Sequence, residues 1–176
     1  MKPFLKRLWS GFSRDDGVAT LEFVLVIPLL TTLFMAAFES GLMRTRFFML
    51  EQAVDTTMRE LRIGHLPGVD HDKLKTEICD RTVIFPNCEN ILKIELRPIS
   101  RATWALPTTQ ATCVDRSAAI QPVTEFGTGQ SGELMLVRVC ATLDAMFPTT
   151  GIGLALPKDG NGGYGLVVVS AFVNEP

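Results

Sequence analysis

The chain of 176 residues is 47% hydrophobic and 20% charged, with a formal net charge of −2 at pH 7. Beyond residue 38 it carries 13 basic and 16 acidic residues, a balance of −3 with no block of positive charge. Phosphate recognition needs concentrated positive charge, so the composition argues against a nucleic-acid-binding protein. A chain of this length suits one membrane span followed by one small domain.

Residues 21–38 form an apolar stretch in which Glu22 is the only charged residue and Pro28 the only proline. About 18–20 such residues cross a hydrocarbon core about 30 Å thick as a helix. A buried core helix is the alternative, but the apolar character on all sides and the basic flank argue against it. Because of that flank, the positive-inside rule places the N-terminus in the cytoplasm and the remainder outside. The flanking cations are Lys2, Lys6, Arg7 and Arg14.

A removable secretory signal would also begin with basic residues and an apolar run. This run is long for such a signal, and the only small-residue site after it, Ala36-Ala37-Phe38, fits the cleavage pattern poorly. We therefore expect a cytoplasmic leader at residues 1–17 and a retained transmembrane helix at residues 18–40.

Glu22 stands out because it is the one charged residue in the apolar stretch. A carboxylate at the edge of a membrane span costs free energy unless it is neutralised or paired, so such a residue marks function by default. Gly17 lies five positions before it, directly after the charged segment Arg14-Asp15-Asp16.

A helical pattern continues beyond the span, because hydrophobic residues recur every three or four positions and charged residues fall mostly off that face. Gly64 and Pro67 are typical of a helix end. A helix over residues 18–63 would be about 70 Å long. We therefore expect residues 41–64 to continue the helix outside the membrane and to pack on a domain of residues 65–176. The packing face consists of Met43, Phe47, Leu50, Val54, Met58 and Leu61.

In that domain, residues 70–80 are predicted to form a short helix with Leu74 and Ile78 inward. Residues 91–97 alternate as a strand, with the aliphatic positions inward and the charged ones outward. The inward set is Leu92, Ile94 and Leu96, and the outward set is Lys93, Glu95 and Arg97.

Two more strands are predicted at residues 133–143 and 166–173. In the first, Leu134, Leu136 and Cys140 are expected to mark the buried side. Residues 99–131 are rich in Thr, Ala, Pro and Gly and predict an irregular connection, with Trp104 packed on the core. The glycine-rich segment 158–163 predicts a turn into the last strand.

All four cysteines lie on the exported side, where an even number indicates two disulfides. Three pairings are possible, and we favour Cys79 with Cys88 and Cys113 with Cys140. Metal ligation is the rival, but no C-x-x-C spacing is present.

The residues give no sign of a catalytic, metal or cofactor site. His65 and His71 are not spaced to share a helical face, and no Ser/His/Asp or Cys/His set is evident. Asp159-Gly160-Asn161 matches the start of a calcium loop, but its twelfth position is Ser170 instead of glutamate. We therefore expect neither an enzyme nor a binder of a small-molecule substrate.

The segment DGVATLEF at residues 16–23, at the head of a long apolar helix, resembles the processing signature of type IV-like prepilins. The sequence of this segment is most similar to the TadE family, the minor pilins or pseudopilins of tight-adherence (Tad/Flp) pili. The motif covers about residues 14–62. Later segments look like the periplasmic domain of longer TadE-like proteins: ICD around Cys79, PNC around Cys88, ELM at 133–135, FPTTG at 147–151 and SAFVNEP at the end.

The resemblance implies cleavage by a membrane prepilin peptidase between Gly17 and Val18, with Val18, Glu22 and Phe23 acting in subunit assembly. It further implies a single-pass bacterial inner-membrane protein that primes or caps an adhesion pilus and enters the extracellular fibre. Its partners would be the peptidase, other minor pilins and the major pilin. The alternative is a signal-anchored periplasmic binding or scaffold module that never joins a fibre. The fold class expected is α+β: one long N-terminal helix on a small antiparallel sheet with two disulfides.

Overall fold

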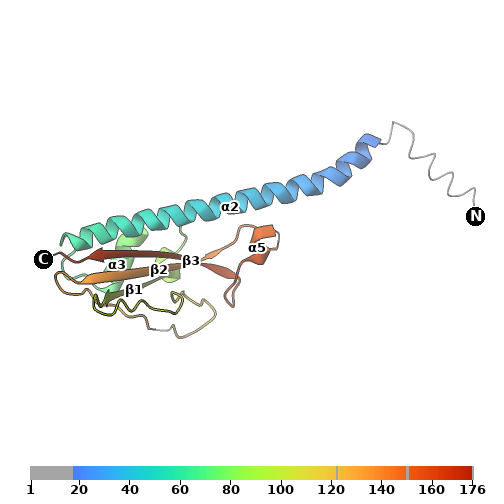
Figure 1. Ribbon diagram of the computed structural model, residues 1–176. Coiled ribbons are helices and arrows are strands. Elements are labelled where there is room, and N and C mark those ends of the chain that lie inside the picture. The colour runs from blue at the N-terminus through green and yellow to red at the C-terminus, as the bar shows by residue number, and fades with distance from the viewer. Residues whose placement is uncertain (1–17, 122, 150, 176) are drawn as a thin grey trace, which may run out of the picture.

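In the computed structural model of the chain, residues 18–121, 123–149 and 151–175 are described, and the side chain of Val18 is not. One long helix lies along a small antiparallel sheet and extends well beyond it (Figure 1). The expected α+β class is confirmed. The elements are α2 (Val18–Arg62), α3 (His71–Asp80), α4 (Cys88–Ile91), β1 (Leu92–Ile99), β2 (Leu134–Asp144), α5 (Gly151–Ala155) and β3 (Gly163–Val173).

Helix α2 runs unbroken for 45 residues, including Pro28. It ends as the sequence predicts, because Gly64 adopts a φ of 75° that glycine accepts without strain. The Gly64 N–H donates to the Leu61 carbonyl over 3.1 Å, and the His65 N–H donates to the Glu60 carbonyl over 2.9 Å. These two bonds form a Schellman motif, which satisfies carbonyls left open at the end of the helix.

The two halves of α2 have different surroundings. Leu50, Val54 and Met58 of the C-terminal half are buried in the core of the domain, as the periodicity predicted. The N-terminal half projects away from the domain without a protein neighbour over most of its length (Figure 1).

Helix α3 closes the core beside α2. The Asp70 carboxylate caps its first turn by accepting the Lys73 N–H over 2.8 Å. Leu74 and Ile78 are fully buried, so the predicted inward face is confirmed. Arg81, directly after α3, donates to Glu60 of α2 over 2.7 Å and links the two helices at the surface.

The sheet has the order β1-β2-β3, with both pairs antiparallel. Val139 of β2 lies opposite Ile94 of β1 and Val168 of β3, and partners across a ladder share a face. These three buried residues belong to the face that packs on α2 and α3. The β2 residues of this face are Met135, Val137, Val139, Ala141 and Leu143.

The predicted facing of β2 was therefore wrong, since Leu134, Leu136 and Cys140 point to the opposite side of the sheet. Leu136 and Cys140 are nevertheless buried, because the irregular segment 100–131 covers that second face. The Arg138 guanidinium donates to the Thr109 carbonyl over 2.6 Å, and the Thr142 hydroxyl donates to the Val114 carbonyl over 2.8 Å.

The prediction for the outward face of β1 was also wrong, because the same segment, residues 100–131 (the covering segment), lies over that face. Lys93 and Glu95, expected to face water, are buried, while Arg97 is half-buried. Glu95 forms an ion pair with Arg138 of β2, which gives its buried charge a partner. Trp104, expected on the core, is instead 62% exposed.

Both favoured disulfides are present. Cys79 at the end of α3 is bonded to Cys88 at the start of α4, with the Cα atoms 5.6 Å apart. Cys113 is bonded to Cys140, with the Cα atoms 5.1 Å apart, and thereby fastens the covering segment to the central strand. A small exported domain gains stability from such covalent links.

Candidate functional site

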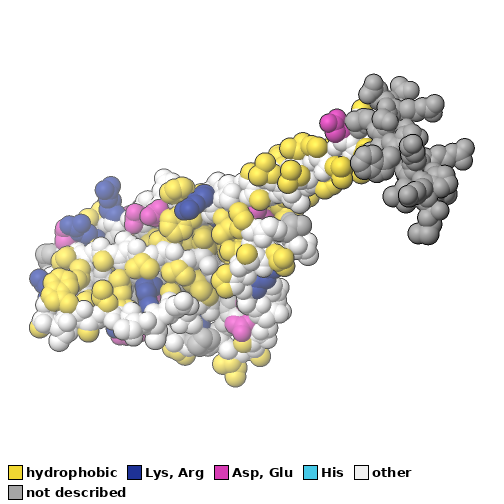
Figure 2. Space-filling view, turned by 45° about the vertical axis from the view of Figure 1, so that its right-hand side comes forward, with side chains coloured by type: hydrophobic (Ala, Val, Ile, Leu, Met, Phe, Trp, Pro, Cys, Tyr) yellow, Lys and Arg dark blue, Asp and Glu magenta, His cyan; other side chains and the backbone are white. Residues whose placement is uncertain are grey.

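The projecting half of α2 exposes hydrophobic side chains on all sides. Leu25 and Leu29 are each 69% exposed, and no residue of its most apolar 18-residue window is buried. Figure 2 shows hydrophobic side chains along this projecting part. A core helix of a soluble protein would bury such residues, and water does not favour so large an apolar surface. Among the described residues this is the one helix long and apolar enough to cross a membrane, which supports single-pass anchoring.

The hydroxyl groups in this half bond within the helix. The Thr31 hydroxyl donates to the Ile27 carbonyl over 2.8 Å, and the Thr32 hydroxyl donates to the Leu29 carbonyl over 2.9 Å. Hydrocarbon offers no partner to a polar group, so this back-bonding suits a helix in lipid. Pro28, which has no N–H to donate, is accommodated without ending the helix.

Glu22 has a different environment. Its side chain is exposed on the second turn of α2, and the described part of the chain offers it no ion-pair or hydrogen-bond partner. Phe23 beside it is also exposed. Gly17 of the predicted processing site lies outside the described residues, and Val18 is the first residue of α2. Residues 18 and 22 of one helix lie one turn apart on the same side.

Glu39, at the other end of the apolar stretch, was not singled out from the sequence. It is only 1% exposed, and its carboxylate accepts the Met146 N–H over 3.2 Å and the Phe147 N–H over 2.9 Å. Two amide donors satisfy a carboxylate that burial would otherwise make costly. The sequence does show an acidic residue at the end of the apolar stretch, which could have marked Glu39. It does not show which backbone amides the Glu39 carboxylate binds.

Arg46 fixes α2 to the sheet about two turns further on. Its guanidinium donates to the Asp144 carbonyl over 2.8 Å and to the Tyr164 hydroxyl over 3.1 Å. Asp144 ends β2 and Tyr164 begins β3, so one side chain joins three elements near the base of the projecting half.

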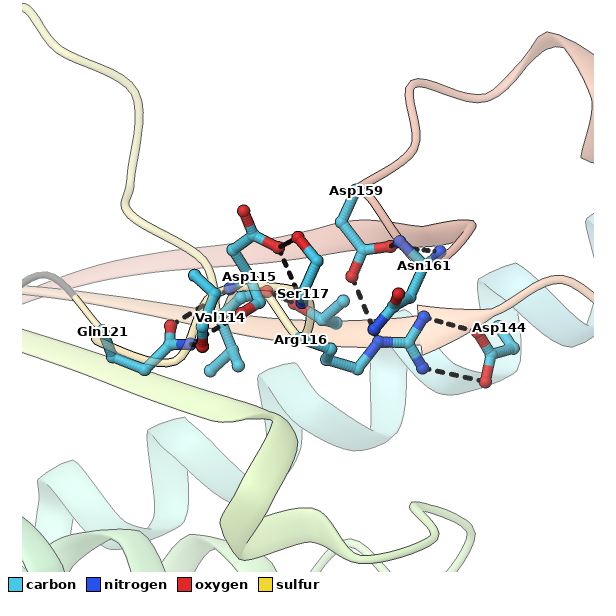
Figure 3. A network of polar contacts seen from close by, with 11 residues as sticks. Val114, Asp115, Arg116, Ser117, Gln121, Asp144, Asp159 and Asn161 are labelled. Atoms are coloured by element: carbon cyan, nitrogen blue, oxygen red, sulfur yellow. Dashed lines mark hydrogen bonds and ion pairs between the residues drawn. The ribbon is translucent and has the colours of Figure 1, made fainter.

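A network of ion pairs fastens the covering segment at the same end of the sheet (Figure 3). The Arg116 guanidinium lies between Asp144 and Asp159 and donates to the two carboxylates over distances of 2.7 to 3.1 Å. The Asp159 carboxylate also accepts the Asn161 N–H over 3.0 Å and the Gly163 N–H over 2.6 Å, which shapes the turn into β3.

These contacts shift the acid–base equilibria of the network. The hydrogen bonds from Arg116 hold the pKa of Asp144 below its usual value. Burial raises the pKa of Asp159, but the bonds from Arg116, Gly163 and Asn161 together outweigh burial and lower it. The segment that resembled the start of a calcium loop thus binds a guanidinium. Over the described ranges, His, Cys, Asp and Glu nowhere gather in a group of three that could hold a metal ion.

The geometry therefore places the sequence-predicted residues in two separate regions. Glu22 and Phe23 lie at the exposed start of α2, whereas the four cysteines stabilise the domain at the other end of the molecule. The two disulfides therefore support the fold of the domain, and they lie far along the chain from the start of α2.

Comparison with known proteins gives one match. The model of the family described as TadE-like protein matches residues 17–59, which comprise the projecting half of α2 and most of the packed half. No curated protein and no solved structure matches the chain. The resemblance of the segments after residue 64 stays a prediction. The match over residues 17–59 agrees with the resemblance of this segment to the TadE family.

Proposed function

We propose that the chain is a minor pilin or pseudopilin of a Tad pilus, held in the inner membrane by α2 until it primes or caps a fibre. The observation that carries this proposal is the exposed apolar half of α2 within the TadE-like segment, with Glu22 near its start, for which the described residues supply no partner. Its N-terminus lies in the cytoplasm and its domain in the periplasm, in accord with the basic residues before the span.

In this proposal a prepilin peptidase cleaves after Gly17. The new α-amino group of Val18 then lies one helical turn from the Glu22 carboxylate. An amine cation and a carboxylate in lipid offset each other's loss of hydration, which costs several kcal/mol for each ion. The same pairing between neighbouring helices in a bundle gives subunits a preferred axial step, with Phe23 packed beside it.

The role is structural and not catalytic. The small domain, with its two disulfides and its covered sheet, shares its core with the C-terminal half of α2. Its partners in the fibre are other minor pilins and the major pilin. A signal-anchored periplasmic module is the rival, and it differs in the fate of residues 1–17.

The experiment is N-terminal sequencing and intact-mass measurement of the protein from membranes of its native host. We expect a mature chain that begins at Val18. Gly17→Arg is expected to remain uncut, since Gly17 is the only small residue suitably placed before the span. Ser13→Arg adds the same charge in the leader and is the matched control, which is expected to be processed.

Three results contradict the proposal. A mature protein that retains residue 1 indicates a signal-anchored module, and one that begins after Ala37 indicates an ordinary secretory signal. Processing of Gly17→Arg to the parent mass likewise overturns cleavage at this position.

A further inference from the structure

The end of the domain from which α2 projects carries apolar side chains outside the core. Phe38 of α2 is 48% exposed, Met146 after β2 is 51% exposed, and Leu154 of α5 is 65% exposed. Phe147 is half-buried beside them. We refer to Phe38, Met146, Phe147 and Leu154 as the apolar collar.

The collar is fixed to α2 by specific contacts. Glu39 accepts the N–H groups of Met146 and Phe147, and the rings of Phe38 and Phe147 pack edge to face with centroids 6.2 Å apart. Residues 145–147 therefore cannot move away from the helix without breaking a buried set of polar contacts.

Helix α5 reaches back along α2 into the apolar stretch. A Cβ on Gly151 would lie 3.6 Å from the Ala36 Cβ, so the two backbones are close together. Ala36 precedes Glu39 by three residues, or about 4.5 Å along the helix axis. The first turn of α5 thus lies level with the last turn of the segment predicted to be in lipid (Figure 1).

The composition of this region suits the boundary of a bilayer. Residues 145–149 and 151–157 include no charged side chain, and the Glu39 carboxylate that accepts the Met146 and Phe147 N–H groups is buried. Gly153 packs against the Phe147 carbonyl so closely that a Cβ would overlap it. This close packing leaves Leu154 on the outer side of α5. Cations follow immediately, since Lys158 is exposed and donates to the Pro148 carbonyl over 2.8 Å, and Arg44 is exposed on α2.

We propose that the apolar collar lies in the interfacial layer of the same membrane that α2 spans, with Met146 and Leu154 among the upper acyl chains. Continuity with the exposed apolar half of α2 identifies lipid as the partner, because the exposed Phe34 of the span stacks on Phe38, which in turn packs on Phe147 of the collar. Apolar side chains on peripheral elements enter the boundary between headgroups and acyl chains to a depth of about 5–10 Å. Lys158 and Arg44 then lie at the level of the lipid phosphates.

This inference rests on the membrane anchoring in the proposed function and goes beyond it. A single helix crossing a bilayer leaves its domain free to tilt. A second lipid contact beside the helix fixes both the tilt of the domain and the depth of the span.

The test uses tryptophan fluorescence of the full-length chain in phospholipid vesicles with brominated acyl chains. The native tryptophans, Trp9 and Trp104, are first replaced by phenylalanine. One tryptophan is then introduced at Leu154 in the collar, at Leu29 in the middle of the span, or at Ile63 at the far end of α2. Ile63 is exposed like Leu154 but lies about 36 Å beyond Glu39. Met146→Trp is a second collar probe, and retention of both disulfides shows that each variant is folded.

The collar probes are expected to lose most of their fluorescence with bromines near the headgroups and less with bromines near the chain ends. The Leu29 probe is expected to show the opposite preference, and the Ile63 probe to keep its fluorescence with both lipids. Quenching at Leu29 but not at Leu154 or Met146 overturns the collar and leaves the anchoring intact. An unquenched Leu29 probe overturns the anchoring itself. Blue-shifted but unquenched collar probes mean that protein covers this surface, which also overturns the proposal.

Discussion

Two carboxylates frame the apolar half of α2, and their environments differ. Glu39 is buried and accepts two backbone N–H groups, so its bonding is complete within the chain. Glu22 is exposed on an apolar helix and has no partner among the residues that the structure describes. A charge in lipid without a partner costs free energy, and in the proposed function an incoming subunit would lower that cost for Glu22.

Glu22→Gln keeps the shape of the side chain and removes its charge. If Glu22 recruits a neighbour, this variant is expected to be inserted and processed normally but to co-purify poorly with partner pilins and to form few fibres. Glu51→Gln, the same exchange in the packed half of α2, is the control and is expected to assemble. Electron microscopy of cell surfaces counts the fibres. Parental piliation by Glu22→Gln would mean that this carboxylate has no part in assembly.

Glu39→Ala leaves two backbone N–H groups without their acceptor. A buried donor that loses its partner costs about 1–3 kcal/mol, so the domain of this variant is expected to unfold at a lower temperature. Glu39→Gln keeps one acceptor oxygen and is expected to fall between the parent and the alanine variant. Thermal unfolding of the purified chain in detergent, followed by near-ultraviolet circular dichroism, measures this order. Equal melting temperatures for all three proteins would show that the two bonds contribute nothing.

The elements differ in how well the sequence predicts them. Leu50, Val54 and Met58 follow a clear helical period because water covers the other side of α2, and Leu74 and Ile78 of α3 do the same. β2 shows no such contrast, since α2 packs on one of its faces and the covering segment on the other. A strand buried on both faces loses the alternation that reveals its facing. The side on which Cys140 lies was therefore not readable from the strand alone.

The pairing of Glu95 with Arg138 escaped prediction for a related reason. Charged residues in a strand ordinarily indicate the water-facing side, but here they lie opposite one another and bond beneath an irregular segment. Cross-strand register decides which charges meet, and register depends on partners far away in the chain.

One disulfide, Cys113–Cys140, holds the covering segment on the sheet. Removing this disulfide tests how much the attachment of the segment stabilises the fold. Cys113 and Cys140 are 27 positions apart, whereas Cys79 and Cys88 are 9 apart. In the chain-entropy account the longer loop stabilises the fold by about 1 kcal/mol more. Replacing both members of the Cys113–Cys140 pair by alanine is thus expected to lower the denaturant midpoint further than the same change at Cys79–Cys88. The reverse order would indicate that strain or denatured-state structure outweighs loop entropy.

The Arg116 network makes the turn into β3 sensitive to acid. The folded-state pKa values of Asp144 and Asp159 are lowered, so both carboxylates stabilise the fold above the ordinary aspartate pKa of about 3.9. That stability is lost as the pH falls below this value toward the lowered folded-state values.

Arg116→Met removes the guanidinium and is expected to flatten this dependence while lowering stability at neutral pH. Melting temperatures of the parent and the variant between neutral and acidic pH provide the comparison. Parallel profiles for the two proteins would exclude the network as the source of the acid response. Arg97→Met, which removes a half-buried arginine that lies between Glu95 and Glu125, outside the Arg116 network, is the matched control.

At the scale of the whole molecule, the sequence predicted a membrane anchor, a helical continuation of it and a disulfide-bonded domain. The long helix packed on a small antiparallel sheet with two disulfides confirms the α+β class. It did not predict that α5 would lie against the anchor at the level of Ala36. The short glycine-containing segment of α5 has no periodicity to read, and the residues that lead into it are bonded to Glu39, more than a hundred positions earlier.

Because α2 is unbroken, it also fixes the direction in which the side chains of the anchor point relative to the domain. Each residue of an α-helix turns the chain by about 100°, so the direction of Glu22 relative to the sheet depends only on how many residues separate them. Exchanging one apolar residue for another within the span leaves that direction unchanged. Removing or adding a single residue swings Glu22 to another side of the molecule, while a change of seven residues restores it to within about 20°. If Glu22 meets a neighbouring subunit, as we propose, the number of residues in the anchor is constrained more tightly than their identity.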